Sequence, residues 1–153
     1  GYGGHFTMSL KNSVGLVAKQ VPGGIYDYMH ELHGSPFQRL MIAEINKHYS
    51  VDFVIMDGAK AFVSGGPDKG EEVDPGLMLG SADRVAVDAA GVAILREFGC
   101  TTLGKKPVFE LDQLRRAVEL GVGAGPATVV ELVPLDEASK GAAERIRAEL
   151  ARE

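Results

Sequence analysis

The sequence predicts an α/β domain in which helices flank a small, mainly parallel sheet. Segments with helical apolar periodicity alternate with short apolar runs, the pattern of a sheet with crossover helices. The run "VDFVIMDG", residues 51–58, is almost continuously apolar, which is typical of a strand covered on both faces. Much of the glycine, 20 of 153 residues, collects in residues 1–24 and 58–80, as expected of loops at strand ends. Because few strands are available, we expect a fragment of a larger three-layer α/β domain.

The first half of the chain predicts two strands and one helix. Residues 5–10 read as a short strand, followed by a glycine-rich loop that ends at residue 24. A helix then begins with Ser35 as N-cap, Pro36 in the first helical position and Gln38 completing a capping box, and it runs to about Tyr49. The strand at 51–58 follows, and residues 64–76 form a long loop.

The second half predicts two strands and three helices. A short strand spans 77–81, and a helix begins at its N-cap Asp83 and ends before Gly99. Residues 111–120 form another helix, and residues 127–133 another strand. The charged tail, residues 136–153, is an amphipathic helix that covers its own domain or packs on a second copy of the chain.

Composition limits the class of protein. The apolar fraction of 45% and charged fraction of 24% are typical of one globular domain, here residues 1–153. No apolar run reaches membrane-spanning length, and no signal segment opens the chain, so we expect a cytoplasmic protein without a membrane partner. The net charge of −5 argues against binding nucleic acid. The single cysteine, Cys100, excludes an internal disulfide and a cysteine-ligated iron–sulfur cluster within this chain.

Asp88 is the residue that most needs an explanation. Its helix, "RVAVDAAGVAILREF", is apolar nearly all round and should be buried, where an unpaired carboxylate costs several kcal/mol. Arg84, Lys11, backbone donors from a neighbouring loop or a metal ion could each compensate its charge. The sequence leaves open whether Asp88 is structural or holds a ligand.

Asp57 and the glycine-rich segment after it are further candidates. Asp57 ends a predicted strand, where ligands bind in open α/β sheets, but turn-forming aspartates are also common there. "SGGPDKG", residues 64–70, offers backbone N–H groups that could cradle an anion, or it is a plain surface loop. The histidines of "HELH", His30 and His33, precede the predicted helix and lack a third ligand at a zinc spacing.

Four blocks in the same order resemble the family catalogued as domain of unknown function 362. The similarity extends over about residues 5–130, and the blocks are Leu10-Lys11-Asn12, Asp57-Gly58, Gly65-Gly66-Pro67 with Gly70, and Ser81-x-Asp83-x-x-Ala86-x-Asp88. The family often has a proline where this chain has Arg84. Its domain also begins upstream of the first block, so the resemblance implies that this chain is the C-terminal portion and that the missing N-terminal portion is a partner.

The resemblance implies that the candidate residues belong to one site. We expect this site to be a cleft at the strand ends that binds a small anionic molecule or a divalent metal. Catalytic roles would fall to Lys11, Asp57 and Asp88, and ligand binding to Asn12, Gly65, Gly66, Gly70 and Ser81. Metal ligands would be Asp57, Asp88 and His5. Chemistry at such a site would be metal-assisted or acid/base catalysis. The alternative is a non-enzymatic accessory module of an iron–sulfur or redox system, in which the same polar residues only hold loops together.

Overall fold

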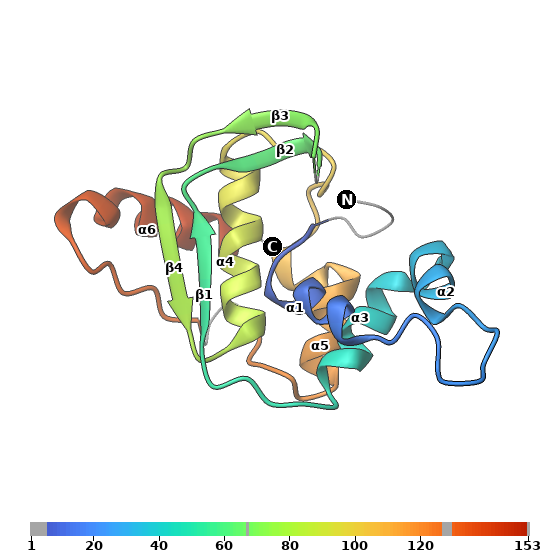
Figure 1. The fold of residues 1–153 in the computed structure, drawn as a ribbon. Coiled ribbons are helices and arrows are strands. Elements are labelled where there is room, and N and C mark those ends of the chain that lie inside the picture. The colour runs from blue at the N-terminus through green and yellow to red at the C-terminus, as the bar shows by residue number, and fades with distance from the viewer. Residues whose placement is uncertain (1–5, 67, 127–129, 153) are drawn as a thin grey trace.

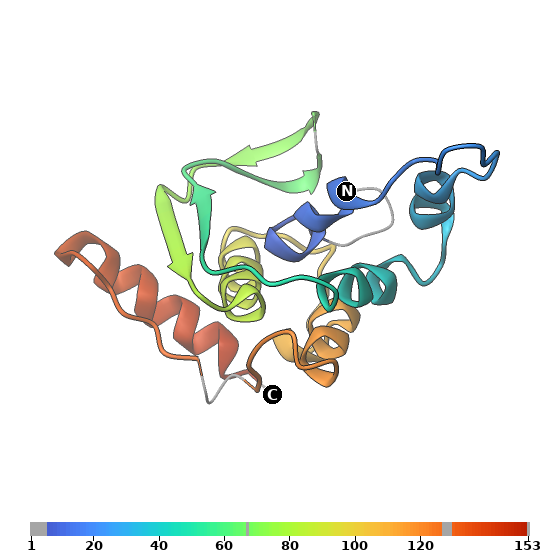
Figure 2. The ribbon, with the colours of Figure 1, turned by 60° about the horizontal axis from the view of Figure 1, so that its bottom comes forward.

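One central helix, α4 (Arg84–Glu97), organises the molecule. The computed structural model describes residues 6–66, 68–126 and 130–152. A bent β-ribbon and the N-terminal helices lie on one side of α4, and α5 and α6 lie on the other (Figures 1 and 2). Asp83 caps α4 as the sequence predicts, accepting hydrogen bonds from the N–H groups of Val85 and Ala86 at 2.7 and 2.9 Å. Gly99 ends it with a φ of +93°.

The predicted parallel sheet is wrong. Strands β1 (Val54–Gly58) and β4 (Leu77–Ser81) pair antiparallel, and so do β2 (Ala61–Gly65) and β3 (Gly70–Val73). The four strands follow one another without a crossover helix, so they form one long ribbon that bends between its two pairs (Figure 1). The segment 64–76, predicted as a loop, therefore contains the end of β2 and the whole of its partner β3. The described chain has α-helices and two two-stranded antiparallel sheets.

The ribbon is also covered on one face only. Along β1 the half-buried Val54, Met56 and Gly58 alternate with exposed Ile55 and Asp57. The continuously apolar run therefore does not reflect burial on both sides: Ile55 is 70% exposed, and Phe53, just before the strand, is 59% exposed. The inner face packs on α4, as its contacts with β1 and β4 show.

The predicted strand at 5–10 is not formed by the described residues: residues 6–8 are irregular, and a helical turn begins at Ser9. Helix α1 (Ser9–Asn12) is a single turn, continued by the 3₁₀ turn η1 (Ser13–Leu16). Helix α2 (Tyr28–Gly34) is an element that the sequence analysis missed, although Asp27 caps it. Helix α3 (Gln38–Asn46) is confirmed, but it ends before Tyr49.

The predicted capping box of α3 is not formed. Ser35 Oγ accepts a hydrogen bond from the N–H of Phe37 at 3.1 Å. The Gln38 side chain does not return the interaction, because it is buried in the protein, where its amide nitrogen and oxygen have no hydrogen-bond partner. Phe37, the residue before the first turn of α3, is 64% exposed.

The C-terminal helices follow the sequence closely. After the 3₁₀ turn η2 (Val108–Glu110) come α5 (Asp112–Glu119) and α6 (Glu137–Leu150), the latter with a capping box between Asp136 and Ser139. The buried stripe of α6 includes Ala142, Ile146 and Leu150, and α6 packs on α4. The predicted strand at 127–133 is wrong for residues 130–133, which are not a strand, and its first three residues lie outside the described chain. None of the helices described is long and apolar enough to cross a membrane.

Candidate functional site

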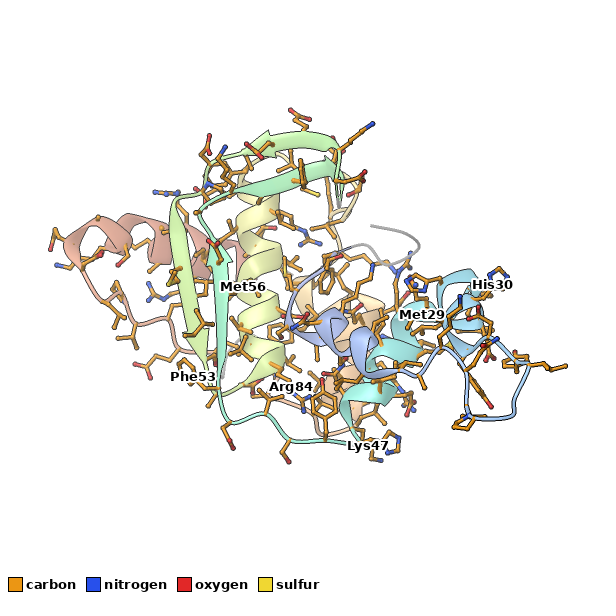
Figure 3. All side chains as sticks on the ribbon, viewed as in Figure 1. Met29, His30, Lys47, Phe53, Met56 and Arg84 are labelled. Carbon is orange, nitrogen blue, oxygen red and sulfur yellow. The ribbon has the colours of Figure 1, made fainter. Side chains whose placement is uncertain are left out.

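Two hollows lie end to end between β1, the N-terminal segment and α4. The smaller has a volume of about 500 Å³ and lies at the α1 end, and the larger, about 780 Å³, lies under β2. Met8, Met56 and Asp57 line both of them. Figure 3 shows Met56 on β1 over the middle of α4, with Arg84 near the start of that helix. The edge of β1 that is not paired with β4 runs along this trough.

Arg84 is the cation of the smaller hollow, and it is 8% exposed. Its Nη1 donates to the side-chain oxygen of Asn46 at 2.9 Å, and its Nη2 donates to the backbone oxygens of Asn46 and Tyr49 at 3.0 and 3.1 Å. The guanidinium carbon lies 4.8 Å from the centre of the Tyr49 ring, within cation–π range. None of the ion pairs among the described residues includes Arg84.

Asn46 joins Arg84 to the α1 segment. It is fully buried, and its Nδ2 reaches the carbonyl oxygen of Leu10 at 2.8 Å and the hydroxyl of Ser13 at 2.7 Å. Leu10 itself is fully buried in the core. These contacts fix the turn that presents Asn12, which is exposed and lines the smaller hollow. Lys11 is not among the residues that line either hollow, and partial burial lowers the pKa of its amine.

Asp88 is fully buried one turn further along α4 and caps α1 from outside that helix. Its Oδ1 accepts from the backbone N–H and the hydroxyl of Ser9 at 2.8 and 2.6 Å, and its Oδ2 accepts from the N–H of Leu10 at 3.0 Å. Burial raises the pKa of Asp88 to about 6; the hydrogen bonds from Ser9 and Leu10 oppose that rise, and the charge of Arg84 opposes it least. Of the compensations considered from sequence, backbone donors from a neighbouring segment contribute most, and the charge of Arg84 contributes less.

The other two candidate side chains at strand ends make short local contacts. Asp57 lies on the outer face of β1, and its Oδ1 accepts a hydrogen bond from the N–H of Ala59 at 2.8 Å. Ser81 Oγ accepts from the N–H of Asp83 at 2.9 Å and lines neither hollow. Across the described residues no group of three or more His, Cys, Asp or Glu side chains could hold a metal ion.

The glycine block forms the tip of the ribbon. Gly65 and Gly66 line the larger hollow, and the N–H of Gly66 donates to the carbonyl of Lys69 at 2.6 Å, which closes the turn. Gly70 does not line either hollow. A Cβ at Gly70 would lie 2.0 Å from the Ser64 carbonyl oxygen, so this position requires glycine for close strand approach.

The larger hollow carries two cations, both already paired with carboxylates. Arg39 Nη1 lies 3.5 Å from Asp112, and Lys60 Nζ lies 2.6 Å from Glu72. The free cysteine, Cys100, is buried on its wall. Sequence analysis missed Arg39 and Lys60, and it considered Arg84 only as a partner of Asp88, because no local pattern places them beside a hollow.

The histidines form no cluster among the described residues. His5 lies outside the described chain. His30 and His33 lie within α2, not before the first helix as expected, and both are exposed. His33 Nδ1 is 2.8 Å from the carbonyl oxygen of Met29. His48, two residues after the end of α3, is also exposed.

Comparison with known families finds a match over a range that includes all four blocks. The family model described as "Domain of unknown function (DUF362)" matches residues 2–93. The chain belongs to the DUF362 family. Neither the curated proteins nor the solved structures contain a match to it. The matched residues include α1, the ribbon and most of α4, and therefore both hollows apart from a few residues at the end of α4 and beyond.

The structure gives the DUF362 motif residues physical roles. In the first block Leu10 fills the core and its backbone joins Asp88 and Asn46. In the last block Asp83 caps α4, and its second carboxylate oxygen also accepts from the N–H of Ala124 at 2.6 Å. Asp88 caps α1. The motif thus joins α1 to α4 and places Asn12 and Arg84 on the same hollow.

Proposed function

We propose that this DUF362 protein binds a small anionic molecule in the smaller hollow, with Arg84 as the charged anchor. The observation that carries the proposal is a buried guanidinium facing a hollow, with its hydrogen bonds made to neutral acceptors. The carboxylates on either side of Arg84 along the chain are Asp83 and Asp88. That of Asp83 accepts hydrogen bonds from backbone N–H groups and forms no ion pair with Arg84. The charge of Arg84 is the weakest influence on the pKa of Asp88, so these two are not a tight ion pair either.

Burial of a cation without a close anion is costly, and a bound carboxylate or phosphate would offset that cost. The three hydrogen bonds of Arg84 use one Nη1 proton and both Nη2 protons. This leaves the Nε proton and a second Nη1 proton, which can donate to an oxyanion. Asn12, exposed on the wall of the same hollow, adds a neutral carboxamide donor.

Direct binding of an anion fits the residues better than binding through a metal or acid/base catalysis. Asp57 is the only acidic residue among those that line the two hollows, and its carboxylate belongs to the outer face of the ribbon. The oxygens of Asp88 are occupied by the donors of α1. We therefore assign the site a binding role, with Asn12 and Arg84 as the ligand contacts.

The test is an NMR titration of the ¹⁵N-labelled protein with sodium acetate and sodium phosphate, at ionic strength held constant with chloride. Binding should shift the Nε–H signal of Arg84 and leave that of Arg145, an exposed residue paired with Glu97, in place. The Asn12→Ala variant should bind about tenfold more weakly, since one hydrogen bond to a charged group is lost.

Gln20→Ala is the matched control, because it removes an exposed carboxamide from a loop that lines neither hollow. Its affinity should equal that of the wild type. Absence of any shift at Arg84 with both anions, or equal affinity of Asn12→Ala and wild type, would contradict the proposal.

A second candidate function is that of an interaction module, which would correspond to an accessory role beside an iron–sulfur or redox protein. The observation in its favour is the outer face of the β1–β4 pair, where Phe53, Ile55 and Met78 are 59%, 70% and 72% exposed. Contiguous exposed apolar side chains of this kind mark contact surfaces. The redox partner itself rests on the family resemblance alone.

A further inference from the structure

We infer that the ligand of this site is an amphipathic anion, with its charged head on Arg84 and its apolar body in the larger hollow. This inference rests on the proposed anion site and adds the chemical class of the ligand. The two hollows share the walls formed by Met8 and Met56, so a molecule held at Arg84 that extends along α4 enters the larger one.

The charges decide which hollow takes the head. In the larger hollow Arg39 and Lys60 each have a carboxylate partner, Asp112 and Glu72. In the smaller hollow Arg84 has no ion pair within the described chain. An anion that binds there can therefore pair with a guanidinium whose charge no carboxylate already neutralises. The head therefore binds at Arg84.

The larger hollow has the size and the lining for an apolar body. Its volume of about 780 Å³ is in the range of small-molecule sites, which are mainly apolar with a few polar groups. Apolar side chains from the N-terminal segment, the ribbon and α4 contribute to its wall, namely Phe6, Phe62, Val63, Leu79, Ile94 and Leu95. From Arg84 to Ile94 the helix rises about 15 Å, so the ligand is elongated.

The passage between the hollows is built from flexible side chains over a glycine. A Cβ at Gly91 of α4 would lie 2.6 Å from the sulfur of Met8 and 3.1 Å from that of Met56. Both thioethers therefore lie directly on the helix backbone. Methionine adapts its shape to a neighbour at little cost, so these two side chains can move aside for an apolar chain.

The experiment compares acetate with octanoate, using protein labelled with ¹³C at the methionine methyl groups. Octanoate should shift the methyl signals of Met8 and Met56, and leave those of the three methionines that line neither hollow, Met29, Met41 and Met78. Octanoate should bind on the order of 100-fold more tightly than acetate, because each buried methylene raises the affinity by up to about fourfold. 1-Octanol, which has the same chain without the charge, should bind at least tenfold more weakly than octanoate.

The Gly91→Ala variant should push Met8 and Met56 into the passage and weaken octanoate binding about tenfold, with acetate unaffected. Gly15→Ala, where a Cβ meets nothing within 4 Å, is the matched control and should bind as the wild type does. Acetate binding at Arg84 without any gain for octanoate, or octanol binding as tightly as octanoate, would overturn this inference and leave the anion site standing. Failure of both acetate and octanoate to bind would overturn the proposed function as well.

Discussion

Asp88 shows how a single buried carboxylate connects two distant parts of the chain. Its three donors belong to Ser9 and Leu10, 79 and 78 positions earlier in the sequence. The apolar surroundings in α4 make its burial predictable from sequence. The identity of its partners was not predictable, because the donors are backbone groups of a turn that forms only against α4.

The pH dependence of stability should report on Asp88. Its folded pKa of about 6 lies above the ordinary carboxyl value of 3.8, so between these values the folded state binds a proton that the unfolded state does not. The contribution of Asp88 to stability is thus greatest at low pH and falls as pH rises from about 4 to 6, by up to about 3 kcal/mol. Urea unfolding at several pH values should show this fall in the wild type relative to Asp88→Asn.

Asp57→Asn is the control for this measurement, because Asp57 is an exposed carboxylate on the outer face of β1. Its stability should follow that of the wild type across the same pH range. The same difference from wild type in both variants would show that the effect is not due to the buried position of Asp88.

At the scale of elements, α1 depends on groups outside itself. A single turn of four residues has no stability of its own. Its N-terminal N–H groups bind Asp88, and the carbonyl of Leu10 accepts from Asn46. The apolar-leaning pattern of residues 5–10 favours a strand, and this prediction failed because two side chains from α3 and α4 supply the partners of a helical turn.

Replacement of Asn46 by alanine should therefore destabilise the fold far more than its position at the end of α3 suggests. The change leaves the Nη1 of Arg84 without its side-chain acceptor. It also removes one of the two side-chain donors to the buried carbonyl of Leu10, the other being the hydroxyl of Ser13. We expect a loss of about 3 kcal/mol or more in the free energy of unfolding, measured by urea denaturation.

Asn12→Ala is the matched control for this loss, since Asn12 has the same side chain in an exposed position. It should change stability by less than about 0.5 kcal/mol. Comparable losses in the two variants would mean that Asn46 does not hold α1 against α4.

At the scale of the whole molecule, the ribbon leaves one apolar face uncovered. Ile55 and Met78 lie on that face, and the aromatic ring of Phe53 lies against Gly80, where a Cβ would come within 3.0 Å of it. The inner face of the same strands packs on α4. The face is the place where contact with another copy or another protein would cover apolar area.

Ile55→Ser and Met78→Ser should leave the stability of the monomer nearly unchanged, within about 0.5 kcal/mol, because both side chains are already exposed. If copies of the chain pair through this face, sedimentation velocity at increasing concentration will show association in the wild type and less in these variants. Leu79→Ser, on the opposite face of β4 and packed against the core, should instead lower stability by about 2 kcal/mol or more. Equal association in the wild type and the two outer-face variants would exclude this face as the contact.

The sequence by itself determined the family, most helices and the burial of Asp88. Helices α4, α5 and α6 were predictable because their end signals lie next to segments of helical periodicity. Helix α4 has the cap Asp83 and the terminal Gly99, α5 is followed by Gly121, and α6 begins at its cap Asp136. Strand β4 was predicted with its observed bounds. These elements depend on local interactions, in which all the residues involved lie within a short stretch of sequence.

Only the tertiary structure decided how the strands pair and where the hollows lie. An apolar run such as residues 51–58 does not indicate whether one or both faces of the strand will be buried, since that depends on which other segments pack against it. The hollow at Arg84 is likewise formed by α1, the segment that follows α3, β1 and α4 together. What this site can bind depends on the distances between these elements. Those distances are set by packing between segments that are far apart in the sequence.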